Sequence, residues 1–317
     1  MTYRQLTSSD RYTISALKME GFNCAQIATH LGRHRSTVCR ELERNRCSHD
    51  NGYRPSKAHS RTATRRSISR RNTQFTAQDY DKVNFLLKQY WSPEQIAGHL
   101  ARTNELQISH ETIYKYNWED RRNFGDLHTF LRGGRKQRRK RYGRYDSRGK
   151  LADKRHISER PASVETRKTK GHWEIDTVMG KGDKHCIVSI VERKTGYLVV
   201  GKLPCRTTEA LNKRVVQLIT QHPTAFKTIT SDNGTEFHGY KQIEEATGVP
   251  FYFATPHHSW ERGTNENTNG LIRQYLPKGS SMAQLTQHQC NAIAKKLNDR
   301  PRKRLQYKTP QECFYGL

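Results

Sequence analysis

The spacing of hydrophobic and polar residues predicts helices in the first half of the chain and strands in the second half. Residues 11–46 predict three helices, because apolar residues recur every three or four positions and Gly21 and Gly32 end the first two segments. Ser36 is a good amino-terminal cap for the third helix, and Val38 lies on its buried side. This spacing is typical of a helix-turn-helix, which we assign to residues 1–50.

The predicted third helix and its preceding turn carry a row of polar and basic side chains. Side chains of these types reach base edges and phosphates when a helix lies in the major groove of DNA. The candidate DNA contacts are Arg33, Arg35, Ser36, Thr37, Arg40 and Arg44. The alternative interpretation is an ordinary three-helix packing unit with a basic, solvated face.

A second helix-turn-helix is predicted in residues 81–131, after a polar, arginine-rich linker at residues 51–80. Ser92 caps a helix with Pro93 in its first position, and Ser109 caps the next helix. The candidate DNA contacts here are His110, Thr112 and Lys115. Chance packing of helices is the alternative, since the turn lacks the usual glycine.

A basic segment separates these helices from the second half of the chain. Residues 132–150 hold ten Lys and Arg against one Asp and have almost no aliphatic side chains. Such a segment cannot bury a core, so we expect residues 132–170 to be a flexible linker that attracts phosphates without sequence preference.

From residue 171 to residue 317 the pattern predicts an α/β domain. Three strand-like runs, a helix, a strand, a short helix, another strand and further helices follow one another, an order that suits a mixed sheet flanked by helices. We therefore predict a multidomain protein, with all-α amino-terminal domains and an α/β core.

Acidic residues occupy unusual places in the predicted core. Asp176 lies in mid-strand, where aspartate is disfavoured, with Glu174 as a rival on the same face. Asp232 ends a strand just before an Asn-Gly turn, where a simple turn-capping role is the alternative. Glu266 and Arg273 are seven residues apart, so they share one face of a predicted helix from 264 to 275.

Composition indicates a polyanionic partner. The chain has a formal net charge of +27, and residues 1–170 carry 37 Lys and Arg against 17 Asp and Glu. No apolar run approaches the roughly 20 residues of a membrane span, and no signal peptide is evident, so we expect a cytoplasmic nucleic-acid binder rather than a membrane-associated protein. The seven cysteines include no CxxC pair, so neither a disulfide framework nor a zinc site is indicated.

Several sequence blocks resemble those of the insertion-sequence-thirty family of bacterial transposases. They are "GHWEIDTVMGKG", "VERKTG", "SDNGTEF", "TPHHSWERGTNENTNGLIRQYLPKG" and "LNDRPRKRLQYKTPQE", together with "IATHLGRHRSTVCREL" and "WSPEQIAGHL". The resemblance implies a ribonuclease H-like, retroviral integrase-like core in which the strand ending at Asp232 lies beside the first strand. It also implies a catalytic and metal-binding triad of Asp176, Asp232 and Glu266, with Arg273 in a basic position seven residues beyond the Glu as a DNA contact. Arg262 precedes the predicted catalytic helix and is a further candidate DNA contact.

The same resemblance implies the activity. A DNA transposase of this kind binds terminal inverted repeats, cleaves a strand to free a 3′-hydroxyl and joins it to target DNA, with two Mg²⁺ ions for which Mn²⁺ substitutes. The expected partner is double-stranded DNA, bound by a homodimer or higher oligomer at the bacterial nucleoid. A DNA-binding repressor with an inactive core and a nuclease acting on RNA or junctions are the rival functions.

Overall fold

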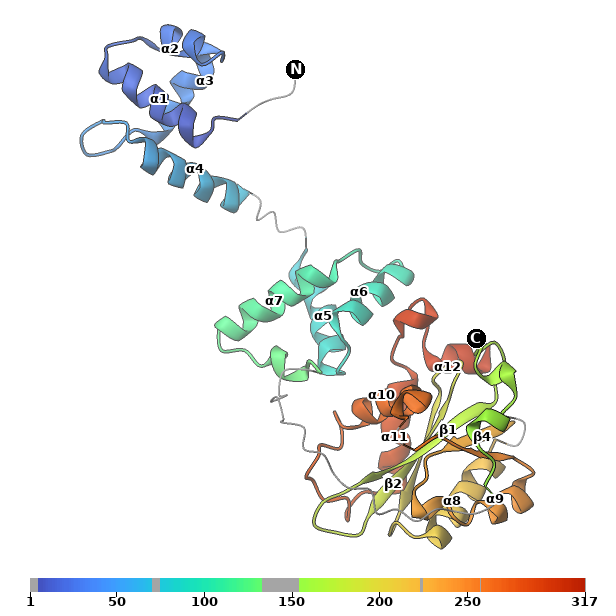
Figure 1. Ribbon diagram of the computed structural model, residues 1–317. Coiled ribbons are helices and arrows are strands. Elements are labelled where there is room, and N and C mark those ends of the chain that lie inside the picture. The colour runs from blue at the N-terminus through green and yellow to red at the C-terminus, as the bar shows by residue number, and fades with distance from the viewer. Residues whose placement is uncertain (1–4, 70–74, 133–153, 223–224, 257, 317) are drawn as a thin grey trace. The chain divides into compact units, whose positions relative to one another are not determined.

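The computed structural model describes residues 5–69, 75–132, 154–222, 225–256 and 258–316. The chain divides into two compact units, Met1–Thr76 and Ala77–Leu317, and each is described by itself (Figure 1). Most of the basic segment predicted at residues 132–150 lies outside the described residues, from position 133 onward.

The first unit contains the predicted three-helix core. Helices α1 (Ser8–Met19), α2 (Cys24–His30) and α3 (Arg35–Asn45) surround a small apolar cluster. That cluster consists of Leu6, Ile14, Ile27, Ala28 and Val38. Gly32 lies in the turn between α2 and α3 with a φ of 62°, a left-handed conformation that glycine adopts without strain. The helix-turn-helix prediction is therefore confirmed.

The amino-terminal cap of α3 differs from the prediction. His34 is the cap, because its Nδ1 atom accepts a hydrogen bond from the backbone N–H of Ser36 at 3.3 Å. Ser36 lies in the first turn, and its hydroxyl contacts the same ring nitrogen at 2.8 Å. Histidine is a less common cap than serine, and for that reason the sequence favoured the wrong residue.

The linker predicted at residues 51–80 is wrong for its central part, which forms helix α4 (Pro55–Ser69). This helix packs against α1, with Ala58 fully buried at the contact. Ala58 is the single buried hydrophobic residue among the described side chains of α4, so the apolar periodicity that predicts a helix is almost missing. Small side chains at the contact, rather than large apolar ones, hold α4 in the first unit.

A buried ion pair joins three helices of this unit. Arg11 of α1 donates from Nε to Oε1 of Glu41 in α3 at 2.6 Å, and the two side chains are 3% and 9% exposed. Arg11 also donates to the carbonyl oxygen of Leu6 at 3.0 Å and to the hydroxyl of Thr62 in α4 at 3.4 Å. Because the guanidinium contacts α1, α3 and α4 together, the packing of α4 depends on this pair.

The second unit begins with α5 (Ala77–Lys88), α6 (Pro93–Arg102) and α7 (His110–Arg122). Ser92 caps α6 with Pro93 in its first position, and Ser109 caps α7, as predicted. None of the helices in the described part of the chain is long and apolar enough to cross a membrane.

These helices contact the carboxyl-terminal part of the same unit. Arg300 donates from Nε to Oε1 of Gln95 in α6 at 2.7 Å, and Arg102 pairs with Glu312 of α12 (Pro310–Tyr315) at 2.9 Å. The ring of Tyr90 packs edge-on against that of Tyr275. Polar contacts of Gln95 and Arg102 therefore join α6 to the carboxyl-terminal segment.

A five-stranded mixed sheet forms the centre of the second unit. Its strands are β1 (His172–Met179), β2 (Cys186–Glu192), β3 (Leu198–Leu203), β4 (Thr228–Ser231) and β5 (Phe251–Phe253). The strand order is β3-β2-β1-β4-β5, with β1, β2 and β3 antiparallel and β4 and β5 parallel to β1. Strand β4 lies beside β1, as the ribonuclease H-like prediction requires.

Helices cover both faces of the sheet (Figure 1). Helices α8 (Thr208–Thr220) and α9 (Tyr240–Thr247) cover one face, and α10 (Gly263–Ile272) and α11 (Gln287–Asn298) cover the other. Trp173 and Ile175 of β1 belong to the first core, whereas Val178 belongs to the second, as strand alternation predicts.

Part of the segment predicted as a flexible linker packs on this sheet. The backbone N–H of Phe253 donates to the carbonyl oxygen of Arg155 at 2.9 Å, extending the β5 edge. Arg160 is buried and donates to the hydroxyl of Thr230 in β4 at 2.8 Å. The linker prediction is therefore wrong for residues 154–170, because backbone pairing, the buried Arg160 and the buried Val164 stabilise them.

Replacing Glu41 with alanine should destabilise the first unit by about 3 kcal/mol, because Arg11 would keep a buried charge without its partner. Hydrogen–deuterium exchange of the full chain should show faster exchange in α1, α3 and α4, with the second unit unchanged. Glu43→Ala, which removes an exposed carboxylate from the same helix, is the control. Equal protection from exchange in the Glu41→Ala and Glu43→Ala variants would contradict the stabilising role of the Arg11–Glu41 ion pair.

Candidate active site

Asp176 lies in the middle of β1, on the face covered by α10. Its Oδ1 accepts a hydrogen bond from the backbone N–H of Thr177 at 2.8 Å, and its Oδ2 accepts one from Nδ2 of Asn269 in α10 at 2.9 Å. The side chain is 26% exposed. Contacts with β1 and α10 therefore fix the position of the Asp176 carboxylate, which stays partly exposed to solvent.

Asp232 directly follows the last residue of β4 and lies at the same level of the sheet as Asp176. The parallel register pairs Glu174 of β1 with Thr230 of β4, so Asp176 and Asp232 each lie two residues beyond a paired position. Oδ1 of Asp232 accepts the backbone N–H of Gly234 at 2.9 Å, which fixes the following turn. The structure thus brings these two predicted carboxylates together.

Arg262 lies between the two aspartates. Its Nη2 atom is 3.4 Å from Oδ2 of Asp176, and its Nη1 atom is 3.3 Å from Oδ2 of Asp232. Nη2 also donates to the carbonyl oxygen of Ile175 at 2.9 Å. One guanidinium therefore occupies the position of a cation shared by both carboxylates, and its own side chain is only 12% exposed.

Burial raises the pKa of the Asp176 carboxyl above its ordinary value. The nearby charge of Arg262 lowers this pKa, and the charge of Asp232 raises it again. Two carboxylates at one point repel each other unless a cation lies between them. The pair is consequently a place where a bound cation is strongly favoured.

Glu174, the alternative to Asp176, has a structural role. It is fully buried, forms an ion pair with Nε of Arg193 at 3.0 Å and accepts the backbone N–H of Asn265 at 2.8 Å. Asn265 lies in the first turn of α10, where a negative charge stabilises the exposed N–H groups. Glu174 therefore holds the start of α10 against β1.

Glu266 lies on α10 with an exposed side chain, outside the contacts that join Asp176 and Asp232. It is four residues after Arg262 and three before Asn269, so helical spacing places it on the same edge of α10 as the residues that contact the aspartates. In the described part of the chain, no three metal-binding side chains converge closely enough to hold an ion. Glu266 must approach the aspartate pair to join a metal site.

A further carboxylate, Glu236, lies beside this pair and was not assigned to the site from the sequence. Its Oε1 atom accepts the hydroxyl of Thr177 at 2.7 Å and pairs with Arg206 at 2.7 Å, while its buried Oε2 atom has no hydrogen-bond partner among the described residues. A Cβ on Gly234 would lie 2.5 Å from that Oε2 and 2.9 Å from Oδ1 of Asp232. A side chain at Gly234 would therefore displace one or both of these carboxylates.

The donor set suits a hard divalent cation. Asp176 and Asp232 share a positive charge, and the unpaired oxygen of Glu236 is adjacent to them. Carboxylate oxygens are the ligands that Mg²⁺ prefers, and it keeps other positions for water or phosphate oxygens. The two aspartates are therefore the residues best placed to hold such an ion.

The basic residues predicted near the site contact protein groups instead of facing solvent freely. Arg262 binds the aspartates, and Arg273, just after α10, donates from Nη2 to the carbonyl oxygen of Met179 at 2.9 Å. We predicted a helix to residue 275, whereas α10 ends at Ile272, with Arg273 as its carboxyl-terminal cap. Burial lowers the pKa of Arg273.

The candidate DNA contacts of the two helix-turn-helix segments lie on separate helices. Arg35, Arg40 and Arg44 are exposed on α3, whereas Arg33 precedes α3 and lies 3.7 Å from Asp10 of α1. Ser36 and Thr37, in the first turn of α3, are half-buried. On α7, His110 and Lys115 are exposed and Thr112 contacts the capping hydroxyl of Ser109 at 2.9 Å.

Comparison with known proteins covers almost the whole chain. A family model described as a helix-turn-helix domain matches residues 2–45. The chain is 39% identical to the transposase for insertion sequence element IS4351 of Bacteroides fragilis, over 98% of this chain and 95% of that protein. It is 36% identical to the transposase InsI for insertion sequence element IS30A of Escherichia coli strain K12, over 98% of this chain and 83% of that protein.

Among solved structures, the catalytic core domain of BIV integrase matches 47% of this chain and 95% of its own, with a TM-score of 0.37 and 20% identity. The sequence similarity to the two transposases, in contrast, extends over 98% of this chain.

Replacing Asp176 with asparagine should stabilise the protein at neutral pH in metal-free buffer. A carboxyl whose pKa is raised in the folded state holds its proton more tightly there than in the unfolded chain. The contribution of this carboxyl to folding stability is therefore fully present at low pH, where the carboxyl is protonated. This contribution is lost as the pH rises through the folded-state pKa. Thermal unfolding should show a higher midpoint for Asp176→Asn near pH 7, and the difference should shrink below about pH 4.

Asp183→Asn is the matched control. Hydrogen bonding by Ser281 lowers the pKa of Asp183, so its ionised form stabilises the fold above the unfolded-state pKa and that contribution is lost on acidification. Its replacement should not raise the midpoint near pH 7. A lower midpoint for Asp176→Asn than for the unaltered protein would contradict the electrostatic account of the site.

Proposed function

The chain belongs to the IS30 family of insertion-sequence transposases, and from this premise we propose that it cuts and joins DNA at the ends of a mobile element. Its substrate would be double-stranded DNA that carries terminal inverted repeats, together with a target duplex. The observation that carries this proposal is the meeting of Asp176 and Asp232 on adjacent parallel strands, where they share one cationic group.

Two phosphoryl transfers account for the reaction. In the first, water attacks the phosphorus at the end of the element, the bond to the 3′-oxygen breaks, and a free 3′-hydroxyl and a 5′-phosphate remain. In the second, that hydroxyl attacks a phosphodiester of the target, so one P–O bond forms as another breaks and a target 3′-hydroxyl leaves. Each target phosphodiester is exchanged for a new one, so no nucleotide cofactor is required.

We propose that Asp176, Asp232 and Glu266 hold two Mg²⁺ ions, for which Mn²⁺ substitutes. Bound divalent metal supplies the charge that activates the attacking oxygen and stabilises the leaving one. Residues of the chain keep the site in order: the amide of Asn269 orients Asp176, and the Gly234 N–H orients Asp232. Gly234 adds no side chain that would displace these carboxylates.

Arg262 would change partners during this process. In the structure it neutralises both aspartates, which metal would neutralise in the loaded site. A guanidinium released from two carboxylates is a strong donor for phosphate oxygens. This exchange supports the assignment of Arg262 as a DNA contact.

The helix-turn-helix segments would supply recognition of the terminal repeats, with α3 and α7 as candidate reading helices. Joining two ends of one element requires two active sites, so we propose a homodimer or higher oligomer that acts at the bacterial nucleoid.

Replacing Asp232 with asparagine should reduce strand cleavage and strand joining by about 10³-fold or more, because one carboxylate of the site loses its charge. Purified full-length protein, Mg²⁺ and DNA bearing the end of the element should yield 3′-hydroxyl nicks and joined products on a sequencing gel. Binding of the same DNA, measured by fluorescence anisotropy, should not change.

Glu266→Gln tests the third position separately, because this side chain is exposed in the structure and must approach the pair. Glu245→Gln, which removes an exposed carboxylate from α9, is the matched control and should keep full activity. Full activity of Glu266→Gln would exclude Glu266 from the proposed triad.

Two outcomes would favour the rival functions. DNA binding without any cleavage by the unaltered protein would favour a repressor. Preferential cleavage of RNA hybrids or junctions over duplex ends would favour a nuclease.

A further inference from the structure

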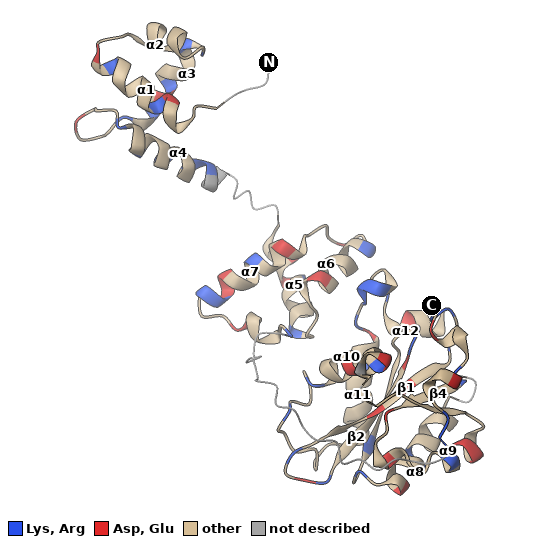
Figure 2. Cartoon of the chain, viewed as in Figure 1, with Lys and Arg blue, Asp and Glu red and all other residues tan. Residues whose placement is uncertain are grey.

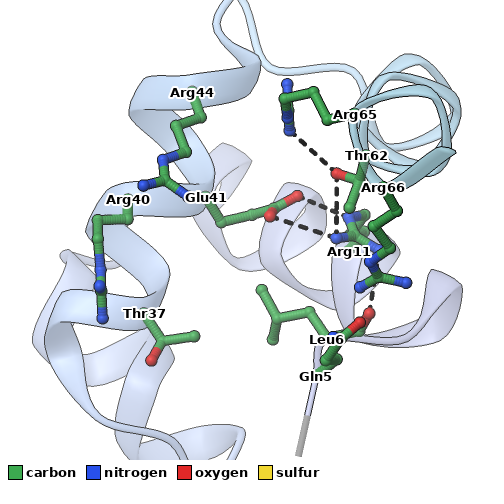
Figure 3. A pocket seen from close by; sticks show the side chains of 10 residues that line it. All are labelled: Gln5, Leu6, Arg11, Thr37, Arg40, Glu41, Arg44, Thr62, Arg65 and Arg66. Carbon is green, nitrogen blue, oxygen red and sulfur yellow. Dashed lines mark hydrogen bonds and ion pairs between the residues drawn. The ribbon is translucent and has the colours of Figure 1, made fainter. Parts of the chain in front are cut away.

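A basic groove in the first unit lies between α3 and α4 (Figure 3). Its volume is about 300 Å³, and Arg40 and Arg44 of α3 face Arg65 and Arg66 of α4 across it. The helix-turn-helix family match ends at residue 45, so it includes only the α3 wall. The wall formed by α4 belongs to the segment whose sequence predicted a linker.

The arginines of the groove are not neutralised by protein carboxylates. Glu41 is the single acid that lines the groove, and Arg11 pairs with it at the base. Among the described residues, none of the four groove arginines has a carboxylate within ion-pair distance. All four arginine side chains are exposed, so the groove concentrates positive charge and suits the binding of an anion.

Neutral groups hold two of these arginines in place. Arg40 donates from Nε to the carbonyl oxygen of Ser36 at 3.1 Å, and Arg65 donates from Nη2 to Oδ1 of Asn45 at 2.8 Å. Such contacts orient a guanidinium without cancelling its charge. The charge balance of the unit has the same sign: residues 1–76 carry 15 Lys and Arg against five Asp and Glu, and Figure 2 shows a basic patch near the end of α4.

We propose that this groove binds the sugar–phosphate backbone of one DNA strand while α3 lies in the adjacent major groove. Arg40 and Arg44 are one helical turn apart, a rise of about 6 Å, and one strand of DNA presents a phosphate about every 3.4 Å of axis, so the α3 wall spans about two phosphates. Arg65 and Arg66 would contact the same backbone from α4. Helix α4 is thus a second wall that clamps phosphates without reading bases.

This inference rests on the proposed function in one respect, since it requires that the chain binds duplex DNA. It adds that α4 contributes affinity independent of sequence and that Arg40 and Arg44 contact phosphates. Replacing a residue that contacts only phosphates weakens binding equally on all sequences and reduces the dependence of binding on salt.

The test is a salt titration of DNA binding with the full-length protein, on an end-bearing duplex and a scrambled duplex of equal length. Arg66→Ala should lower affinity several-fold on both duplexes and reduce the slope of log affinity against log salt by about 1. The double variant Arg65→Ala/Arg66→Ala should reduce the slope by about 2. Arg66→Lys should restore most of the slope, since it keeps the charge.

Lys57→Ala is the matched control, because it removes the same charge from α4 nine positions away, on the opposite side of the helix from Arg66. Lys57 is not part of the groove lining, so its replacement should leave the slope nearly unchanged. Arg66 is exposed, and hydrogen exchange of α4 in each variant checks that the helix is retained.

The possible results separate the hypotheses. Equal slopes for Arg66→Ala, the double variant and Lys57→Ala would overturn the phosphate groove while leaving the proposed function intact. Loss of affinity on the end-bearing duplex alone would also overturn it, because that pattern indicates base reading. If the unaltered protein bound neither duplex, both the proposed function and the phosphate groove, which requires duplex binding, would be overturned.

Discussion

The repulsion between Asp176 and Asp232 is the constraint on which the rest of the core depends. Parallel pairing of β1 with β4 carries both carboxylates to one level of the sheet, so a cation must accompany them. Arg262 supplies it in the structure, and Arg262 directly precedes α10. Together with the contact between Glu174 and the Asn265 N–H, this attraction sets where α10 begins and therefore where Asn269 and Glu266 lie.

Much of the fold and of the site follows from local sequence signals. Strand alternation correctly separated Ile175 from Val178, and a mid-strand aspartate correctly marked Asp176 as unusual. The neighbouring strands that bring Asp232 to it are a non-local feature, which the family resemblance predicted and residue spacing alone did not. Helix α4 was missed because its contact with α1 uses Ala58 and polar side chains, which leave no apolar periodicity in the sequence. Glu236 was missed because its burial depends on Thr177 and Arg206, both distant in the chain.

The two units use their arginines in different ways, so total charge does not locate the DNA surface. In the core, Arg193 pairs with Glu174, Arg206 with Glu236, and Arg262 with two aspartates. These cations stabilise carboxylates of the core, and Arg262 would become available to an external anion only if metal took its place. In the first unit, the groove arginines are held by neutral groups and keep their full charge. A basic residue in this protein is therefore a candidate phosphate contact where no carboxylate accompanies it or, as proposed for Arg262, where metal would replace it on its carboxylates.

The position of Arg262 couples the two ligands of the proposed reaction. One guanidinium cannot neutralise Asp176 and Asp232 and also bind a phosphate, so the proposed divalent metal would compete with Arg262 for the same carboxylates. Metal binding would release a positive charge at the edge of the site, where it favours the incoming phosphodiester. By thermodynamic reciprocity, DNA that draws Arg262 away from the aspartates raises their affinity for metal by the same factor. An arginine in this position therefore keeps two carboxylates together without metal, and at the proposed site it would favour the binding of metal and DNA together.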